Sequence, residues 1–176
     1  MFPIITMDIL FLQMIQAIVV LSIMGIFGYF DIKYREIPMK TVKWLPVFYG
    51  ISLTIFYGCF CICLIHNILS AHPITVILPV ITAVLLPFLL WFFGKGKVGA
   101  IDSRIMTMVM LVVPNLYFQM IFLAVLCVIT LIMFVGTKYL TKSYDDTTSD
   151  GEQKYIPQMV SIEVASVLMF ITWFTL

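Results

Sequence analysis

The sequence predicts an all-α membrane protein that folds as a bundle of six transmembrane helices. Hydrophobic residues make up 62% of the 176 residues and charged residues only 11%, whereas a soluble domain carries about 25% charged residues. The apolar residues gather in runs of about 20, which is the length that a helix needs to cross the hydrocarbon of a bilayer. No internal repeat and no separate soluble segment interrupts the pattern, so we expect one integral-membrane domain over residues 1–176.

The first three spans are expected at 9–30, 44–65 and 73–93. The first run is too long for the apolar core of a signal peptide and has no basic segment before it, so it should remain as a membrane span. A charged segment follows it, and the short stretch "HNILSAHP" joins the second span to the third.

The last three spans are expected at 100–114, 116–137 and 157–175. The fourth is short, since fifteen helical residues cover only about 22 Å, and its polar start is therefore expected below the membrane surface. Pro114 and Asn115 make the tight turn into the fifth span, and the polar stretch 138–156 separates the fifth span from the sixth.

The basic residues predict the orientation of the bundle. All ten Lys and Arg residues fall in three segments, Lys33–Lys43, Lys95–Arg104 and Lys138–Lys154, which six spans place on one side. The connections on the other side contain none. The positive-inside rule makes the three segments cytoplasmic and puts both termini outside, as in a multi-pass protein of the cell membrane whose partners include the lipid bilayer.

Several chemistries are disfavoured at this stage. The net charge of +1 gives no basic surface for nucleic acid. Gly94, Gly96 and Gly99 spell G-x-G-x-x-G, but this pattern indicates a dinucleotide site only between a strand and a helix, and here it follows a membrane span.

The cysteines and histidines predict no metal site. The stretch "CFCIC" matches neither a zinc motif nor a disulfide framework, and Cys59 and Cys63 are expected to share a helix face from which Cys61 points away. His66 and His72 lie on the side opposite the charged segments.

Two aspartates are expected at one depth of the membrane. Asp31 ends the first span and Asp102 begins the fourth, so both lie at the cytoplasmic border if those spans pack side by side. Ionisable residues at membrane depth are costly and usually face a bundle interior or a wet cavity. Taken singly, each aspartate is better explained as an interfacial residue, for example one paired with Lys33 or Arg104. Taken together, they favour a shared site.

Aspartic proteolysis is the chemistry that uses such a pair. Two carboxyl groups about 3 Å apart cannot easily both ionise, so they share one proton. The ionised group takes a proton from the attacking water, and the protonated group donates to the peptide carbonyl. Since the pair titrates as a unit, neither role is assigned to one residue.

At these residues the chain resembles the type IV prepilin peptidases, including the archaeal preflagellin peptidases. The family signature Asp-x-Lys/Arg-x-Arg-x-Ile-Pro is matched by "DIKYREIP", Asp31 to Pro38, and the second signature, Gly-x-hydrophobic-Asp, by "GAID", Gly99 to Asp102. Many members have a lysine two residues after the second aspartate, where this chain has Arg104. Ile156-Pro157 is a looser similarity.

The resemblance implies an intramembrane aspartic endopeptidase without a cofactor. Its substrates would be prepilins or preflagellins with a short basic leader before an apolar helix, cut at the cytoplasmic border, with Asp31 and Asp102 as the catalytic pair. Lys33, Arg35 and Arg104 would tune the pKa of a carboxyl group or bind acids of the substrate. The leading cysteine-rich zinc segment of larger, methylating members has no counterpart before the first span, so we expect peptidase activity without methylation.

Two departures from the family pattern bear on substrate fit. Met39 stands where many members have a polar residue after Ile-Pro, and the glycine run before Asp102 is sparser than in other members.

Other polar residues lie inside spans. Glu163 is about six residues into the last span, roughly 9 Å below its cytoplasmic end, and is expected either as a third acid near the pair or as a protonated group bonding between helices. Gln13, Gln16 and Gln119 are expected to hydrogen-bond across helices, and Gly25 and Gly28 to allow close approach of the first span, so all five are interpreted as packing residues.

Two other classes of function are considered beside the peptidase. A non-enzymatic membrane subunit of a pilus or secretion machine would keep the bundle but needs no paired acids. A proton-coupled carrier would relay protons through Asp31, Asp102 and Glu163, but carriers usually show inverted repeats and midplane sites. The sequence leaves the oligomeric state open.

Overall fold

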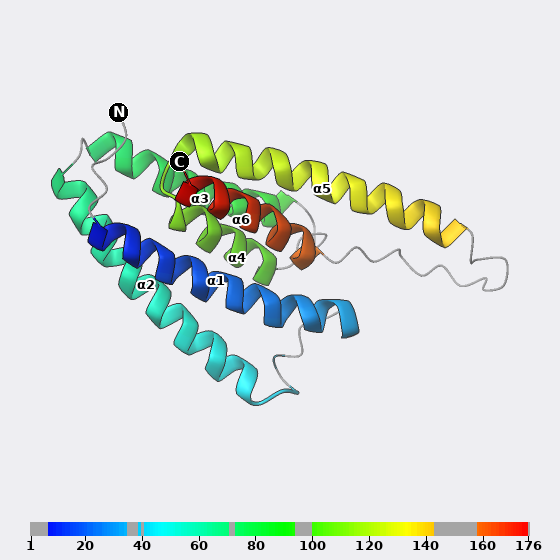
Figure 1. Ribbon diagram of the computed structural model, residues 1–176. Helices are drawn as coiled ribbons and strands as arrows, with labels where there is room; N and C mark the ends of the chain where they lie inside the picture. Colours follow the sequence, from blue (N-terminus) through cyan, green and yellow to red (C-terminus); the bar gives the residue numbers. More distant parts are fainter. Residues whose placement is uncertain are drawn as a thin grey trace.

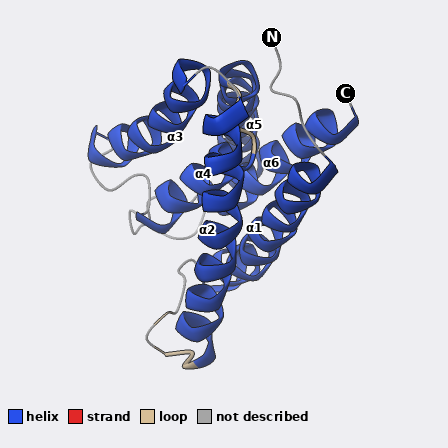
Figure 2. Ribbon diagram, turned by 90° about the vertical axis from the view of Figure 1, so that its left-hand side faces the viewer, coloured by secondary structure: helices blue, strands red, loops and turns tan. Residues whose placement is uncertain are grey.

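The computed structural model describes residues 7–34, 39, 41–70, 73–93, 100–142 and 158–175, and all the regular secondary structure in these residues is helical (Figures 1 and 2). The helices are α1 (Met7–Tyr34), α2 (Trp44–Ser70), α3 (Pro73–Phe93), α4 (Ala100–Val112), α5 (Leu116–Lys142) and α6 (Gln158–Thr175).

Each predicted span corresponds to one helix, and three helices run further than predicted, including α2, which was expected to end at 65 and continues to Ser70. α1 continues to Tyr34, so Asp31 lies within the helix and not after its end. α5 continues to Lys142. The predicted start of the polar loop at 138 is therefore wrong, because the stretch 137–142 contains no glycine or proline that would end the helix. The residues after Lys142 and before Gln158 lie outside the described part of the chain.

Four helices are long and apolar enough to cross a membrane: α1, α2, α3 and α5. α6 is apolar but shorter. Many large apolar side chains on these helices are exposed, among them Ile18 at 61%, Leu69 at 82% and Ile74 at 70%. Exposing these apolar side chains to water would cost free energy, whereas exposing them to the hydrocarbon of a lipid bilayer does not. The described helices therefore have the surface of a membrane protein.

The short helix α4 lies at the centre of the bundle. It packs against α1, α2, α3 and α6, and Figure 2 shows it among the other helices while α3 lies at the edge. Eight of its residues are buried, including Ile105 and Val109. Its 13 residues span only about 20 Å, less than the hydrocarbon thickness of about 30 Å. Its neighbours therefore cover α4 on most sides.

The three glutamines bond across helices, as predicted. Gln119 of α5 is fully buried, and its Nε2 donates to the carbonyls of Pro79 on α3 at 3.1 Å and Met110 on α4 at 3.0 Å. The other two link α1 to its neighbours: Gln16 Nε2 donates to the Phe56 carbonyl of α2 at 3.5 Å, and Trp173 Nε1 of α6 donates to Gln13 Oε1 at 3.4 Å.

The cysteines of α2 face as predicted. Cys63 is buried, Cys59 is half-buried and Cys61 is exposed, and all three are free thiols. Their arrangement follows the helical period, because residues four apart share a face while a residue two positions along points away.

Candidate active site

Three helix ends that carry the predicted acids meet at one end of the bundle. The C-terminal end of α1 and the N-terminal ends of α4 and α6 lie on the right in Figure 1. α1, α4 and α6 pack against one another in all three pairs. The described residues of the predicted site, Asp31, Lys33, Asp102, Arg104 and Glu163, all lie on these helices.

Asp31 lies on the buried face of α1. Only 7% of the residue is exposed, and its carboxylate accepts a hydrogen bond from the backbone N–H of Met159 in the first turn of α6. The first N–H groups of a helix lack intrahelical acceptors and carry partial positive charge. The N-terminal end of α6 therefore supplies Asp31 with a hydrogen-bond donor from a neighbouring helix.

Lys33 points along the exposed face of the same helix. Its Nζ donates to the Tyr29 hydroxyl at 3.0 Å and lies 5.4 Å from the centre of the Tyr29 ring. Since residues two apart do not share a helix face, Asp31 and Lys33 are directed to different surroundings. Lys33 therefore lies on the exposed face of α1, whereas Asp31 lies on the buried face.

Asp102 lies in the first turn of α4 and is half-buried. The neighbouring residue, Ser103, is buried and its Oγ donates to the Pro87 carbonyl of α3 at 2.8 Å. This bond ties the start of α4 to α3. The position of Asp102 therefore depends on the contact of α4 with α3 as well as with α1.

Arg104 contacts α2, through a residue that the sequence analysis did not single out. The Arg104 guanidinium faces the hydroxyl of Tyr49, although the geometry is not that of a regular hydrogen bond. Tyr49 is 6% exposed, and its ring packs on that of Phe27 with centroids 5.4 Å apart. Phe27 precedes Asp31 by one helical turn.

A tyrosine this deep in an apolar span gives one clue in the sequence. Because a buried tyrosine hydroxyl usually has a polar partner, the presence of Tyr49 in this span predicts a polar group on a neighbouring helix. The identity of that neighbour, Arg104, comes only from the packing of α2 against α4.

Glu163 lies in the interface between α6 and α1. A methyl group at Gly28 would be 3.2 Å from Glu163 Oε2, and one at Gly25 would be 3.9 Å from Oε1. The glycines predicted to allow close approach therefore leave the room that the Glu163 side chain occupies. The structure places this acid between helices, one turn along α1 from Asp31.

Arg35, Pro38 and Gly99 of the predicted site lie outside the described residues, as does Ile156-Pro157. Met39 is half-buried and packs against the core. Among the described side chains, no group of three or more His, Cys, Asp and Glu residues is arranged to hold a metal ion.

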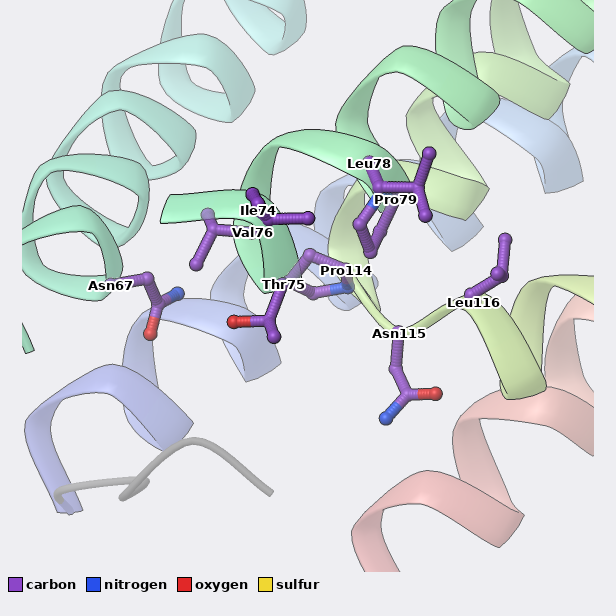
Figure 3. A pocket seen from close by; sticks show the side chains of 9 residues that line it. All are labelled: Asn67, Ile74, Thr75, Val76, Leu78, Pro79, Pro114, Asn115 and Leu116. Atoms are coloured by element: carbon purple, nitrogen blue, oxygen red, sulfur yellow. The ribbon is translucent and has the colours of Figure 1, made fainter. Parts of the chain in front are cut away.

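A pocket of about 260 Å³ lies between the end of α2, the start of α3 and the turn from α4 to α5 (Figure 3). Its polar groups are those of Asn67, Thr75 and Asn115, and none of the nine residues that line it is charged. The helix ends that form it are opposite to those that carry the acids (Figure 1). It has no group suited to general acid–base catalysis.

Comparisons with protein-family models, with curated proteins and with solved structures each find no match to this chain.

Proposed function

We propose that the protein is an intramembrane aspartic endopeptidase that removes the leader peptides of prepilins or preflagellins. The observation that carries the proposal is the meeting of two aspartate-bearing helix ends. α1 ends with the buried Asp31 of "DIKYREIP", and α4 begins with Asp102 of "GAID". The two helices pack against each other, and these ends lie at the same end of the bundle (Figure 1).

The proposal includes a topology in which all six helices cross or enter the membrane. The three charged segments join helix ends on one side, and the positive-inside rule makes this the cytoplasmic side. Both chain termini then face outward. Because α4 is shorter than the bilayer and surrounded by other helices, Asp102 would lie at the cytoplasmic border, where a peptide bond just outside an apolar substrate helix arrives.

The proposed reaction needs only the two carboxyl groups and water. The ionised carboxyl takes a proton from water, whose oxygen bonds to the carbon of the scissile carbonyl, and the protonated carboxyl donates its proton to the carbonyl oxygen. When the tetrahedral intermediate collapses and the C–N bond breaks, the carboxyl that accepted the water proton gives it to the leaving amine. The other carboxyl takes back the proton from the hydroxyl group as the product carbonyl forms, which restores the starting state of the pair. The Met159 N–H donates to the Asp31 carboxyl, and the pair as a whole carries the shared proton.

The basic neighbours have separate roles in this proposal. Arg104 and Tyr49 form one wall beside the α1 end, and Arg104 is placed to bind an acidic group of the substrate. Lys33 faces outward on α1, where the substrate would approach. Arg35 belongs to the same motif.

The first test is co-expression with a tagged prepilin that carries a basic leader, read as a mass shift on a gel. We expect the shift with the wild type and not with Asp31→Asn or Asp102→Asn, at equal protein levels. Asp8→Asn is the matched control, because Asp8 is an exposed acid at the opposite end of α1, and it should cleave normally.

Three outcomes would contradict the proposal. Cleavage by either catalytic variant at a near-normal rate would exclude the pair. A shift with all variants would identify a host protease as its source. No cleavage of several different prepilins by the wild type would instead favour a non-enzymatic subunit of a pilus or secretion machine.

A further inference from the structure

We propose that Glu163 is a positioning residue that sets the register of α6 against α1 and thereby holds the Met159 N–H on the Asp31 carboxylate. This inference rests on the proposed function, because it assigns Asp31 to the reaction. It adds a residue outside both sequence motifs, on a third helix.

Two glycines on one face of α1 leave the space that the Glu163 side chain occupies. Gly25 and Gly28 are three residues apart, so they lie one above the other on the helix surface. At Gly28 a Cβ would lie 3.2 Å from Glu163 Oε2 and 3.9 Å from Met159 Cγ. The same point on α1 therefore contacts both residues of α6, and any larger side chain there would compete with the Glu163 carboxyl for space.

The contact with Gly28 and the contact with Asp31 are stacked along the same interface. Asp31 follows Gly28 by one turn on α1, and Met159 precedes Glu163 by one turn on α6. Because α1 and α6 run in opposite directions (Figure 1), the two contacts lie in sequence along one interface. Glu163 lies against Gly28, and Met159 lies against Asp31 about 5 Å further along. A shift of α6 by a single residue is about 1.5 Å with a rotation of about 100°. That movement would take the Met159 N–H off the carboxylate.

The chemistry of the side chain supports a function beyond packing. A carboxyl group inside an apolar interface is costly, and an apolar side chain of the same length would fill the space between two helices at lower cost. The far end of the interface is held by Trp173 and Gln13. Glu163 lies against Gly28 at the near end, one turn from Asp31.

A double-substitution cycle tests the inference. Gly28→Ala should lower the kcat for prepilin cleavage about tenfold while KM stays the same. The new methyl group would lie 3.2 Å from Glu163 Oε2 and push α6 aside, and a misplacement of about 1 Å can cost about a hundredfold in rate. Glu163→Asp, which is one methylene shorter, should bring kcat in the Gly28→Ala background back to within about threefold of the wild type. Glu163→Ala should lower kcat, whereas Glu163→Gln, which has nearly the same shape as glutamate, should keep a kcat close to that of the wild type.

The control variants share the same substitution. Gly58→Ala has no atom within 4 Å of the new methyl group, and Gly25→Ala meets Glu163 only at 3.9 Å. All three glycines lie in helices and gain the same helix propensity on becoming alanine. Differences between them therefore report the contact with Glu163, and Gly25→Ala should fall between the other two. The unfolding midpoint is measured on the same preparations.

Each alternative outcome is distinct. The proposed contact between Glu163 and Gly28 is refuted if Gly28→Ala cleaves as well as Gly58→Ala. It is also refuted if Glu163→Asp fails to restore kcat in the Gly28→Ala background. If the cycle shows coupling in the unfolding midpoint but none in kcat, Glu163 is structural only, and the positioning role is refuted while the proposed peptidase stands. If the wild type cleaves no prepilin, the proposed function and the positioning role both fail. The unfolding midpoints of the variants then still decide whether Glu163 packs against Gly28.

Discussion

Asn in place of Asp31 should abolish cleavage without destabilising the protein. Asp31 is 7% exposed, and burying a charge costs several kcal/mol unless partners compensate it. Asparagine has nearly the same shape, keeps an oxygen that accepts from the Met159 N–H, and removes the charge. The hydrogen bond weakens from about 2 kcal/mol for a charged acceptor to about 1 kcal/mol for a neutral one, and the removed desolvation cost offsets this loss. We therefore expect an unfolding free energy equal to that of the wild type or up to about 1 kcal/mol higher.

Cleavage should respond in the opposite way. General acid–base catalysis contributes about 10² to 10⁴ in rate, so kcat should fall at least a hundredfold in Asp31→Asn. Asp31→Ala should lose the same activity but also the bond to α6, at a cost of about 1 to 2 kcal/mol. In a protein of 176 residues, 1 kcal/mol shifts the midpoint by about 2–4 °C, so the two variants should be separable.

Cys63 provides the assay for unfolding. It is 4% exposed, and a thiol-reactive fluorogenic dye reaches it only when the helices separate. The other thiols, Cys59, Cys61 and Cys127, are more accessible and are replaced by alanine in the reference protein. A midpoint that falls as far in Asp31→Asn as in Asp31→Ala, together with retained cleavage, would show that Asp31 is a structural acid and would refute this reasoning.

Three further predictions concern the Tyr49 hydroxyl, the Ser103 hydrogen bond and the membrane topology. Tyr49→Phe removes only the hydroxyl that faces Arg104 and should lower kcat roughly threefold, since this contact is weaker than a regular hydrogen bond, which contributes about 0.5–1.5 kcal/mol. Tyr57→Phe on the exposed side of α2 should have no effect, and equal rates for the two would exclude a role for the Tyr49 hydroxyl. Ser103→Ala removes one interhelical bond and should lower the unfolding free energy by about 0.6–1.7 kcal/mol, seen as an earlier Cys63 signal; an unchanged midpoint would show that the bond contributes nothing. A cysteine introduced at Ser149 should be labelled by an impermeant reagent only from the cytoplasmic side, and labelling from outside would reverse the proposed topology.

The sequence alone was sufficient to locate the six helices. Runs of apolar residues with charged or proline-containing ends are local features, and the helices begin and end within a few residues of the predicted spans, with α3 at the same bounds. The end of α5 was missed because the polar stretch after residue 137 is still compatible with a helix. The bonding of Gln13, Gln16 and Gln119 across helices was also predictable, because a buried amide in an apolar bundle needs a partner from a neighbouring helix.

The identity of the neighbours was decided only by the tertiary structure. The bond of Asp31 to the Met159 N–H, the position of Glu163 over Gly28 and the contact of Arg104 with Tyr49 each join helices that are far apart in the sequence. They depend on which helices are adjacent, and on the rotation and axial register at which their side chains interlock. The apolar surface of a membrane helix is nearly uniform around its axis, so its sequence indicates the depth of a residue far better than the direction in which it points.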